Sequence, residues 1–207
     1  MNNNWLTRAL EESRARGFLG PGPVEPHIEH SLGFAASWHD HSERPPNSLI
    51  DLGSGGGVPG LVLAQHWGVR TLLTDSMMKR ANFLIEVLGW EEAPSSCEVI
   101  IGRVEQIARL DRLEEAVELV TARSFGPPSV TAECGVRFLK VGGLMIVSEP
   151  PSDDVHDRWS PLGLEELGLQ SYGRIRHGAA FQVLIKTKAT SSKYPRESGV
   201  PRKKTIF

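Results

Sequence analysis

Cysteine is scarce in this sequence, which has two cysteines and two tyrosines among 207 residues. Cys97 and Cys134 lie far apart in the chain, so they do not form the closely spaced pairs that are typical of structural zinc sites. A low cysteine content is also typical of proteins from a reducing compartment. We therefore expect a cytoplasmic protein without a metal site.

The sequence also lacks long apolar runs and an excess of charge of one sign. No apolar run approaches the roughly 20 residues that a membrane-spanning helix needs. The first residues, Met1 to Asn4, lack the basic and apolar stretches of a signal peptide, and we expect no membrane partner. Lys and Arg total 23 against 25 Asp and Glu. This balance neither requires nor excludes a nucleic-acid partner, because local patches matter more than totals.

From residue 47 onward, short apolar segments alternate with segments of helical periodicity. Helices are predicted over 58–67, 76–88 and 128–139, and the last two strands form a hairpin that turns at Gly178. The predicted strands cover 48–52, 69–74, 98–101, 117–122, 142–148, 171–176 and 181–187. This alternation predicts a Rossmann-like α/β fold, with a mostly parallel seven-stranded sheet and helices on both faces.

Two shorter segments flank this domain of residues 47–188. Residues 1–46 form a short N-terminal helical region, with helices predicted over 4–17 and 27–38. Residues 189–207 form a basic C-terminal tail. Basic residues from the last strand onward are Lys186, Lys188, Lys193, Arg196, Arg202, Lys203 and Lys204, opposed by Glu197. Such a tail either grips the phosphates of a nucleic acid or is solvated and disordered.

Glycines concentrate in one loop, Gly53-Ser-Gly55-Gly-Gly57-Val58-Pro59-Gly60, which follows the strand over 48–52. Glycine lets the backbone turn sharply and approach a ligand closely. The loop contains the Gly-x-Gly-x-x-Gly spacing of a dinucleotide site, so the motif alone does not identify its ligand. Pro59 is predicted in the first turn of the helix that follows.

Acidic residues around this loop indicate which ligand it binds. Asp51 precedes the first glycine, and Asp75 ends the next strand, where a carboxylate accepts hydrogen bonds from both ribose hydroxyls of an adenosine. This pattern is typical of S-adenosylmethionine-dependent methyltransferases. Three alternatives remain open: a glycine turn that only packs strand on helix, Asp75 as a helix cap, and a dinucleotide-dependent oxidoreductase. The predicted cofactor-binding residues of this region are Gly53, Gly55, Gly57, Val58 and Asp75.

Two later loops carry further candidates. Val104 and Glu105 follow the third strand, where Val104 could pack on an adenine ring and Glu105 could meet its exocyclic amine; alternatively, Glu105 simply opens a helix. Arg123 follows the fourth strand, facing the methyl group and its acceptor, and a guanidinium plane can stack on a base. The alternative is a surface ion pair. Cys134 could act as a nucleophile, but it lacks a partner motif, and we expect a packed residue.

Together these residues resemble the RsmG/GidB family, the bacterial methyltransferases that modify N7 of a guanine in small-subunit (16S) ribosomal RNA. The resemblance covers roughly residues 27–207. It rests on His27-Ile-Glu-His-Ser-Leu32, the Asp51–Gly60 loop, Leu73-Thr-Asp-Ser76 with Lys79-Arg80, Arg103-Val-Glu105, Ala122-Arg-Ser-Phe125 and Lys193-Tyr-Pro-Arg196.

The resemblance implies a class I fold, S-adenosylmethionine as cofactor, and ribosomal RNA or the small ribosomal subunit as partner. We expect a monomer. Gly53 and Val58 would contact the cofactor from the first loop, and Val104 and Glu105 would contact its adenosine. Arg123 would lie beside cofactor and base, where it is the candidate for base positioning. Guanine N7 has a free lone pair and no proton to lose, so no general base is required.

Two departures from the family pattern concern the substrate. The N-terminal region is short, and Ser148-Glu149-Pro150 stands where the family has Leu-Lys-Gly. Both changes fall where RNA is expected to bind. They keep open a small-molecule S-adenosylmethionine-dependent methyltransferase and a non-catalytic paralogue that binds RNA or the ribosome.

Overall fold

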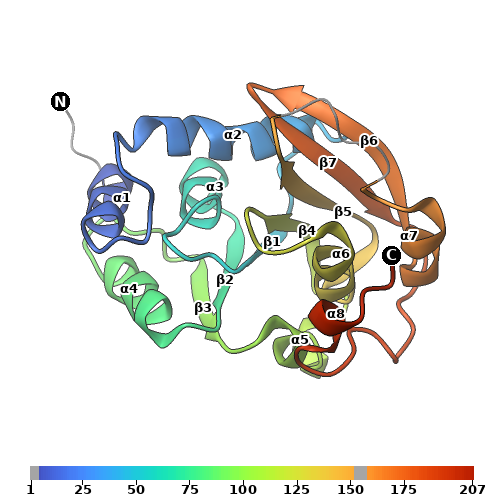
Figure 1. Ribbon diagram of the computed structural model, residues 1–207. Helices are drawn as coiled ribbons and strands as arrows, with labels where there is room; N and C mark the ends of the chain where they lie inside the picture. Colours follow the sequence, from blue (N-terminus) through green and yellow to red (C-terminus); the bar gives the residue numbers. More distant parts are fainter. Residues whose placement is uncertain (1–4, 152–157) are drawn as a thin grey trace.

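In the computed structural model, which describes residues 5–151 and 158–207, seven strands form one sheet in the order β3-β2-β1-β4-β5-β7-β6 (Figure 1). Neighbouring strands from β3 to β5 pair in parallel, and β7 runs antiparallel to both β5 and β6. The strands are β1 (Ser48–Leu52), β2 (Arg70–Asp75), β3 (Cys97–Ile101), β4 (Val117–Ala122), β5 (Leu139–Glu149), β6 (Leu169–His177) and β7 (Ala179–Lys186). The Rossmann-like prediction and the hairpin at Gly178 are confirmed.

Four helices cover one face of the sheet (Figure 1). They are α1 (Trp5–Ala15), α2 (Glu25–His39), α3 (Gly60–Trp67) and α4 (Met78–Leu88). Phe34 of α2 packs with Leu49 and Phe181 of the sheet, and Leu61 of α3 packs with Phe83 of α4. Every residue of β1 is buried, as expected for a parallel strand covered on both faces.

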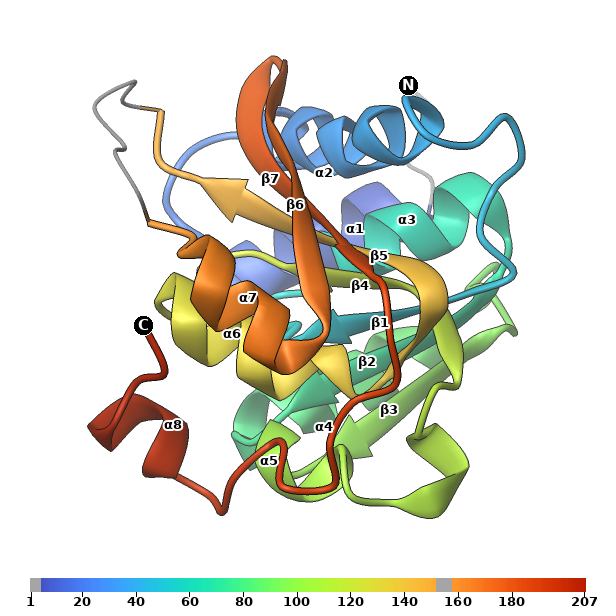
Figure 2. The same ribbon diagram turned by 90° about the vertical axis from the view of Figure 1, so that its right-hand side faces the viewer.

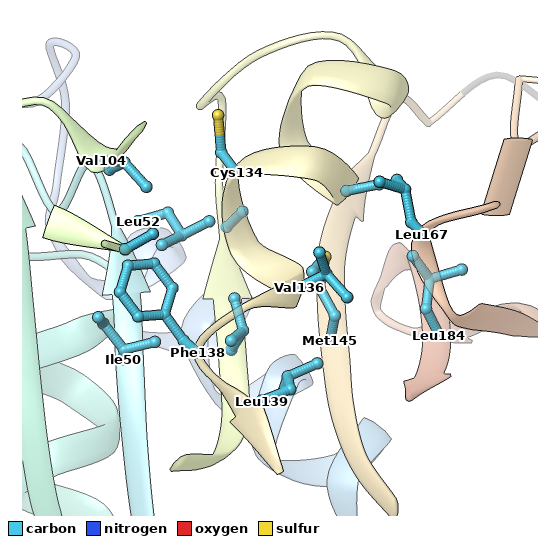
Figure 3. Packing of buried hydrophobic residues seen from close by; sticks show 14 of the residues in the cluster. Ile50, Leu52, Val104, Cys134, Val136, Phe138, Leu139, Met145, Leu167 and Leu184 are labelled. Atoms are coloured by element: carbon cyan, nitrogen blue, oxygen red, sulfur yellow. The ribbon is translucent and has the colours of Figure 1, made fainter. Parts of the chain in front are cut away.

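The opposite face carries α5 (Val104–Ile107), α6 (Pro128–Val136) and α7 (Pro161–Leu167). Figure 3 shows the core beneath them, where Val136 of α6 and Leu167 of α7 pack near Leu184 of β7. All residues of α6 after Pro128 are buried. A 3₁₀ turn (Asp111–Leu113) and a short helix, α8 (Val200–Lys203), complete the described elements.

Both chain ends pack on the domain. The Trp5 indole N–H donates to the Val87 carbonyl at 2.7 Å, and Ser13 Oγ donates to the Gly56 carbonyl at 2.9 Å. Residues 1–4, which include the predicted helix start at Asn4, lie outside the described residues. The C-terminal segment runs along α5 and α6 to α8 (Figure 2).

Polar contacts to buried groups order the C-terminal segment, together with apolar packing of Tyr194, Ile206 and Phe207 on the core. Arg196 donates to the Glu133 carboxylate from its amide at 2.8 Å and from Nη2 at 2.6 Å. Tyr194 is buried beside this pair. The alternative of a solvated, disordered tail is therefore wrong.

Some predicted boundaries are also wrong. The helix over 128–139 ends at Val136, because Leu139 pairs with Val117 and extends β5. The helix α7 was not predicted, although its start carries a capping signal: Ser160 Oγ accepts the Gly163 amide at 3.3 Å, and Pro161 follows the cap. Among the described residues, no helix is both long and apolar enough to cross a membrane.

Candidate cofactor and substrate cleft

A cleft opens at the carboxyl ends of β1 to β4, the edge of an α/β sheet where ligands generally bind. It has two sides that share Gly53, Arg80 and Ser124. The α5 side, with about 660 Å³ of empty space, is also lined by Asp75, Ser76, Met77, Gly102, Arg103, Val104, Glu105, Phe125, Val130, Cys134 and Arg202. The α2 side, with about 680 Å³, is also lined by Phe18, Leu19, Gly20, His27, Ser54, Gly55, Gly56, Val58 and Arg123.

The glycine loop uses its amides internally. Gly53 N–H donates to Thr74 Oγ1 at 3.2 Å, Ser54 N–H to the Thr74 carbonyl at 2.7 Å, and Gly55 N–H to Asp75 Oδ2 at 2.9 Å. A pyrophosphate site instead needs amides that point at the ligand. The loop therefore suits a ligand that donates hydrogen bonds or carries positive charge, which disfavours the dinucleotide alternative.

The second part of the loop is built for packing. Gly57 has a left-handed φ of 97°, and a Cβ there would lie 2.5 Å from the Leu61 side chain. Gly57 lines neither side of the cleft, whereas Val58 lines the α2 side. Pro59, which follows a cis peptide bond, precedes the first helical residue, Gly60. The prediction that Pro59 lies inside the first turn is wrong by one residue.

Asp51 is the internal anchor of this loop. Its carboxylate accepts the Thr121 hydroxyl at 2.8 Å and the Gly60 amide at 3.1 Å. The side chain is buried and lies outside both linings. Burial raises the pKa of Asp51 to about 6, because desolvation disfavours the charged form. Asp51 thus ties β1 to β4 and α3.

Asp75 joins the loop to the start of α4. Its Oδ2 accepts the Gly55 amide, and its Oδ1 accepts the Met77 amide at 2.8 Å. The helix itself begins at Met78, with Met77 as its cap residue. A carboxylate offers about four lone-pair positions, so Asp75 retains acceptor capacity toward the α5 side, which it lines.

Glu105 also presents a carboxylate to the α5 side. Its Oε1 accepts the Gly199 amide at 3.0 Å and Arg103 Nη2 at 3.0 Å. Burial alone would raise the pKa of Glu105, but these hydrogen bonds hold it below the usual value. The residue opens α5 and lines the cleft beside Val104, so the two interpretations of this position are compatible.

Arg123 lines the α2 side. Its Nη2 lies 3.0 Å from His27 Nδ1, so its hydrogen-bonding partner is a histidine rather than a surface carboxylate. Its Nη1 is buried and has no hydrogen-bond partner within the described part of the chain. Burial lowers the pKa of Arg123, and the nearby Asp51 carboxylate opposes this shift.

Several lining residues were not predicted as site residues. Arg80 lies where the two sides meet, Phe125 and Arg202 line the α5 side, and His27 lines the α2 side. His27 and Arg80 belong to motifs that carry the family resemblance, which was the available signal. Arg202 reaches the cleft only because its Nη2 donates to the Phe125 carbonyl at 2.9 Å.

Cys134 lies in the core, 1% exposed, with one edge toward the α5 side (Figure 3). Burial raises the pKa of its thiol, which keeps the sulfur protonated and weakly nucleophilic. Among residues 5–151 and 158–207, no cluster of three histidine, cysteine or acidic side chains could hold a metal ion.

Glu149, the carboxylate in the Ser148-Glu149-Pro150 departure, is used structurally. It accepts hydrogen bonds from Arg158 and from the Trp159 indole, and it lies outside both linings. Several cations from the end of β7 onward are also held by protein groups: Lys186 donates to the Leu139 carbonyl at 2.7 Å, and Lys193 pairs with Glu166. Besides Lys193, the exposed cations after the last strand are Lys188, Arg202, Lys203 and Lys204.

Comparison with known proteins gives one consistent family. The family model described as rRNA small subunit methyltransferase G (GidB) matches residues 23–155. The Ribosomal RNA small subunit methyltransferase G of Symbiobacterium thermophilum is 31% identical over 200 residues, covering 89% of this chain and 80% of that protein. The protein of the same name from Leuconostoc citreum is 32% identical and covers 79% of this chain and 71% of its own length.

Solved structures show the same fold at low identity. The antibiotic-resistance methyltransferase Kmr superposes with a TM-score of 0.56 at 16% identity, covering 68% of this chain and 87% of its own. A variant of MtNAS in complex with S-adenosylmethionine superposes with a TM-score of 0.58 at 14% identity, covering 88% and 73%.

Proposed function

This chain belongs to the family of the ribosomal RNA small subunit methyltransferase G, and from this premise we propose that it methylates N7 of a guanine in 16S ribosomal RNA. It is an S-adenosylmethionine-dependent methyltransferase with a class I fold. The observation that carries the proposed reaction is the chemical division of the cleft. The α5 side presents two carboxylates, Asp75 and Glu105, among its arginines, whereas the α2 side presents arginine and histidine without a carboxylate.

The α5 side suits the cofactor. Asp75 and Glu105 supply acceptors for the hydroxyls and amine of a nucleoside, and Val104 and Val130 add apolar surface. We propose that Gly53 contacts the cofactor where the two sides meet, and that Gly55 and Val58 contact it from the α2 side. When bound, S-adenosylmethionine supplies an electrophilic methyl group, which leaves its sulfur as a neutral thioether. Gly57 does not line the cleft; its lack of a side chain lets Leu61 pack closely beneath the loop.

The α2 side suits a nucleophile that has no proton to lose. Arg80, Arg123 and His27 line it, and none of its lining residues is a carboxylate. The acceptor nitrogen of His27 already receives the Arg123 donor, so His27 is not placed as a general base. Guanine N7 needs positioning rather than deprotonation, and positioning can supply roughly 7–11 kcal/mol of a barrier.

A few exposed cations near the cleft could meet the RNA backbone. Arg202, Lys203 and Lys204 lie on or next to α8, and α8 packs on α6 beside the α5 side. Because most other tail cations have protein partners, we expect a modest number of phosphate contacts and a correspondingly modest salt dependence of binding.

The test is methyl transfer to small-subunit particles from a strain that lacks the gene. The purified protein is incubated with these particles and methyl-labelled S-adenosylmethionine, and nucleosides are then identified by mass spectrometry. We expect labelled N7-methylguanosine with the wild type. We expect none with Asp75→Ala, which removes a proposed cofactor contact, and wild-type activity with Asp111→Ala on the 3₁₀ turn. Label in a small acceptor, with none in RNA, would contradict the proposed target.

A further inference from the structure

His27 and Arg123 form one unit in the α2 side of the cleft. An arginine side chain has donors and no acceptor, so the 3.0 Å contact from Arg123 Nη2 requires a lone pair on His27 Nδ1. The proton of the neutral imidazole must then be on Nε2. The histidine therefore holds the guanidinium only in one protonation state and one tautomer.

One nitrogen of the Arg123 guanidinium has no hydrogen-bond partner among the described residues. This nitrogen, Nη1, is buried, and an unpaired buried donor is destabilising. A substrate acceptor that reaches Nη1 would remove that destabilisation. The Hoogsteen edge of guanine presents two acceptors, N7 and O6, whereas adenine presents a donor in place of O6. Nucleophilic attack by N7 leaves O6 available to Arg123.

We propose that His27 is a positioning residue that holds Arg123, and that Arg123 Nη1 donates to O6 of the target guanine while N7 faces the methyl group. This inference rests on the proposed function, because it names how that reaction selects its base. It makes guanine selection depend on a side chain of α2 that does not itself touch the reacting atoms.

The unit should be sensitive to acid. Protonation would turn His27 Nδ1 into a donor and place two cations 3.0 Å apart. Burial and the charge of Arg123 lower the pKa of His27 from its usual value, which keeps the ring neutral at pH 7. Other charged or titratable groups on this side are Arg80, which shares the lining, and His30 on the next turn of α2, with Asp51 behind Arg123.

Two variants separate the effect of losing the hydrogen-bond acceptor at His27 from the effect of protonating His27. His27→Asn places its side-chain oxygen near the position of Nδ1 and cannot be protonated, whereas His27→Leu has no acceptor. With labelled particles, we expect His27→Leu to lower kcat by about 10- to 100-fold, the range for a misplaced positioning group. We expect His27→Asn to keep kcat within about threefold and to lose the acidic limb of the pH profile. His41→Asn, outside the cleft, should leave both unchanged.

Calorimetry with S-adenosylmethionine and thermal unfolding check that all variants bind cofactor and fold. Full activity in His27→Leu, or an unchanged acidic limb in His27→Asn, would overturn the proposal. If the wild type methylates no particle, the proposed function fails. The unit is then judged by ¹⁵N NMR of the histidines, in which His27 must show the Nε2–H tautomer and a pKa that rises in Arg123→Leu. A different tautomer or an unmoved pKa refutes the pair.

Discussion

The two ends of the chain both border the cleft and both bury apolar side chains, but the C-terminal end adds a buried ion pair. In the N-terminal end, Trp5, Leu6, Ala9 and Leu10 bury apolar side chains against α3 and α4. In the C-terminal end, Arg196 pairs with the fully buried Glu133. Apolar burial contributes in proportion to area and is insensitive to charge state. A buried ion pair depends on every partner being present.

This difference matches what each end does at the cleft. The N-terminal end brings Phe18, Leu19 and His27 to the α2 side, where a fixed wall suits the positioning of a base. The C-terminal end brings the Gly199 amide to Glu105 and Arg202 to the α5 side. These two contacts at the cleft are polar, so we infer that cofactor binding and the order of the C-terminal end depend on each other.

The largest expected loss of stability follows substitution in the N-terminal end. Trp5→Ala removes a side chain that is 1% exposed, and such changes cost about 3–5 kcal/mol. Trp5→Phe keeps most of the apolar area and loses the hydrogen bond to Val87, so its cost should be about 1 kcal/mol. Urea unfolding measures both. Wild-type stability in Trp5→Ala would show that α1 does not belong to the cooperative unit.

Loss of the ion pair at the C-terminal end should lower the free energy of unfolding less than Trp5→Ala does, and should disturb local order more. Glu133→Gln breaks the pair with Arg196, which is one-quarter exposed. We therefore expect a loss of about 2–3 kcal/mol, below the 3–5 that a fully buried unpaired charge costs. Limited trypsin digestion should cleave the chain after Arg196 and Arg202 faster than in the wild type. The control is Glu98→Gln, which breaks an exposed pair with Arg112 and should cost less than about 1 kcal/mol. Equal digestion of all three proteins would refute the role of Glu133.

Acid should loosen the N-terminal end through His30. This ring contacts Ser148 Oγ at 3.0 Å and packs on Phe34 and Phe181. Burial, with the charges of Arg123 and His27, lowers the pKa of His30 from 6.5 to about 4. The folded state then binds fewer protons than the unfolded state, so stability is lost as the pH falls from about 6.5 to 4.

Comparison of His30→Phe with the wild type isolates this effect. Between pH 7 and 4 the wild type should lose about 2 kcal/mol more than the variant, a value discounted for partial exposure. Asp51, whose pKa burial raises to about 6, acts with the opposite sign, because its stabilising neutral form is lost as the pH rises through 6. Only the difference between the two proteins is therefore informative. Parallel pH curves would show that His30 is not a buried neutral base.

The order of strands and helices followed from the sequence because each signal is local. The largely apolar segment over 48–52 predicts a covered strand, and the glycines after it permit the left-handed turns that the loop adopts at Gly53 and Gly57. Asp75 and Glu105 were also predictable, since parallel strands bring their carboxyl ends to one edge. Local patterns failed at α7 and at the end of α6, where pairing of Leu139 with β4 outweighed helical propensity.

The sequence by itself determined the α/β alternation, the glycine loop and the two carboxylates, because these depend on backbone geometry and on periodicity within a few residues. Only the tertiary structure decided which donors already have partners within the protein. Loop amides donate to Thr74 and Asp75, cations of the tail pair with Glu133 and Glu166, and Arg123 donates to His27. Those pairings join residues that are distant in the chain. Their partners are set by the packing of whole elements, which no local pattern records.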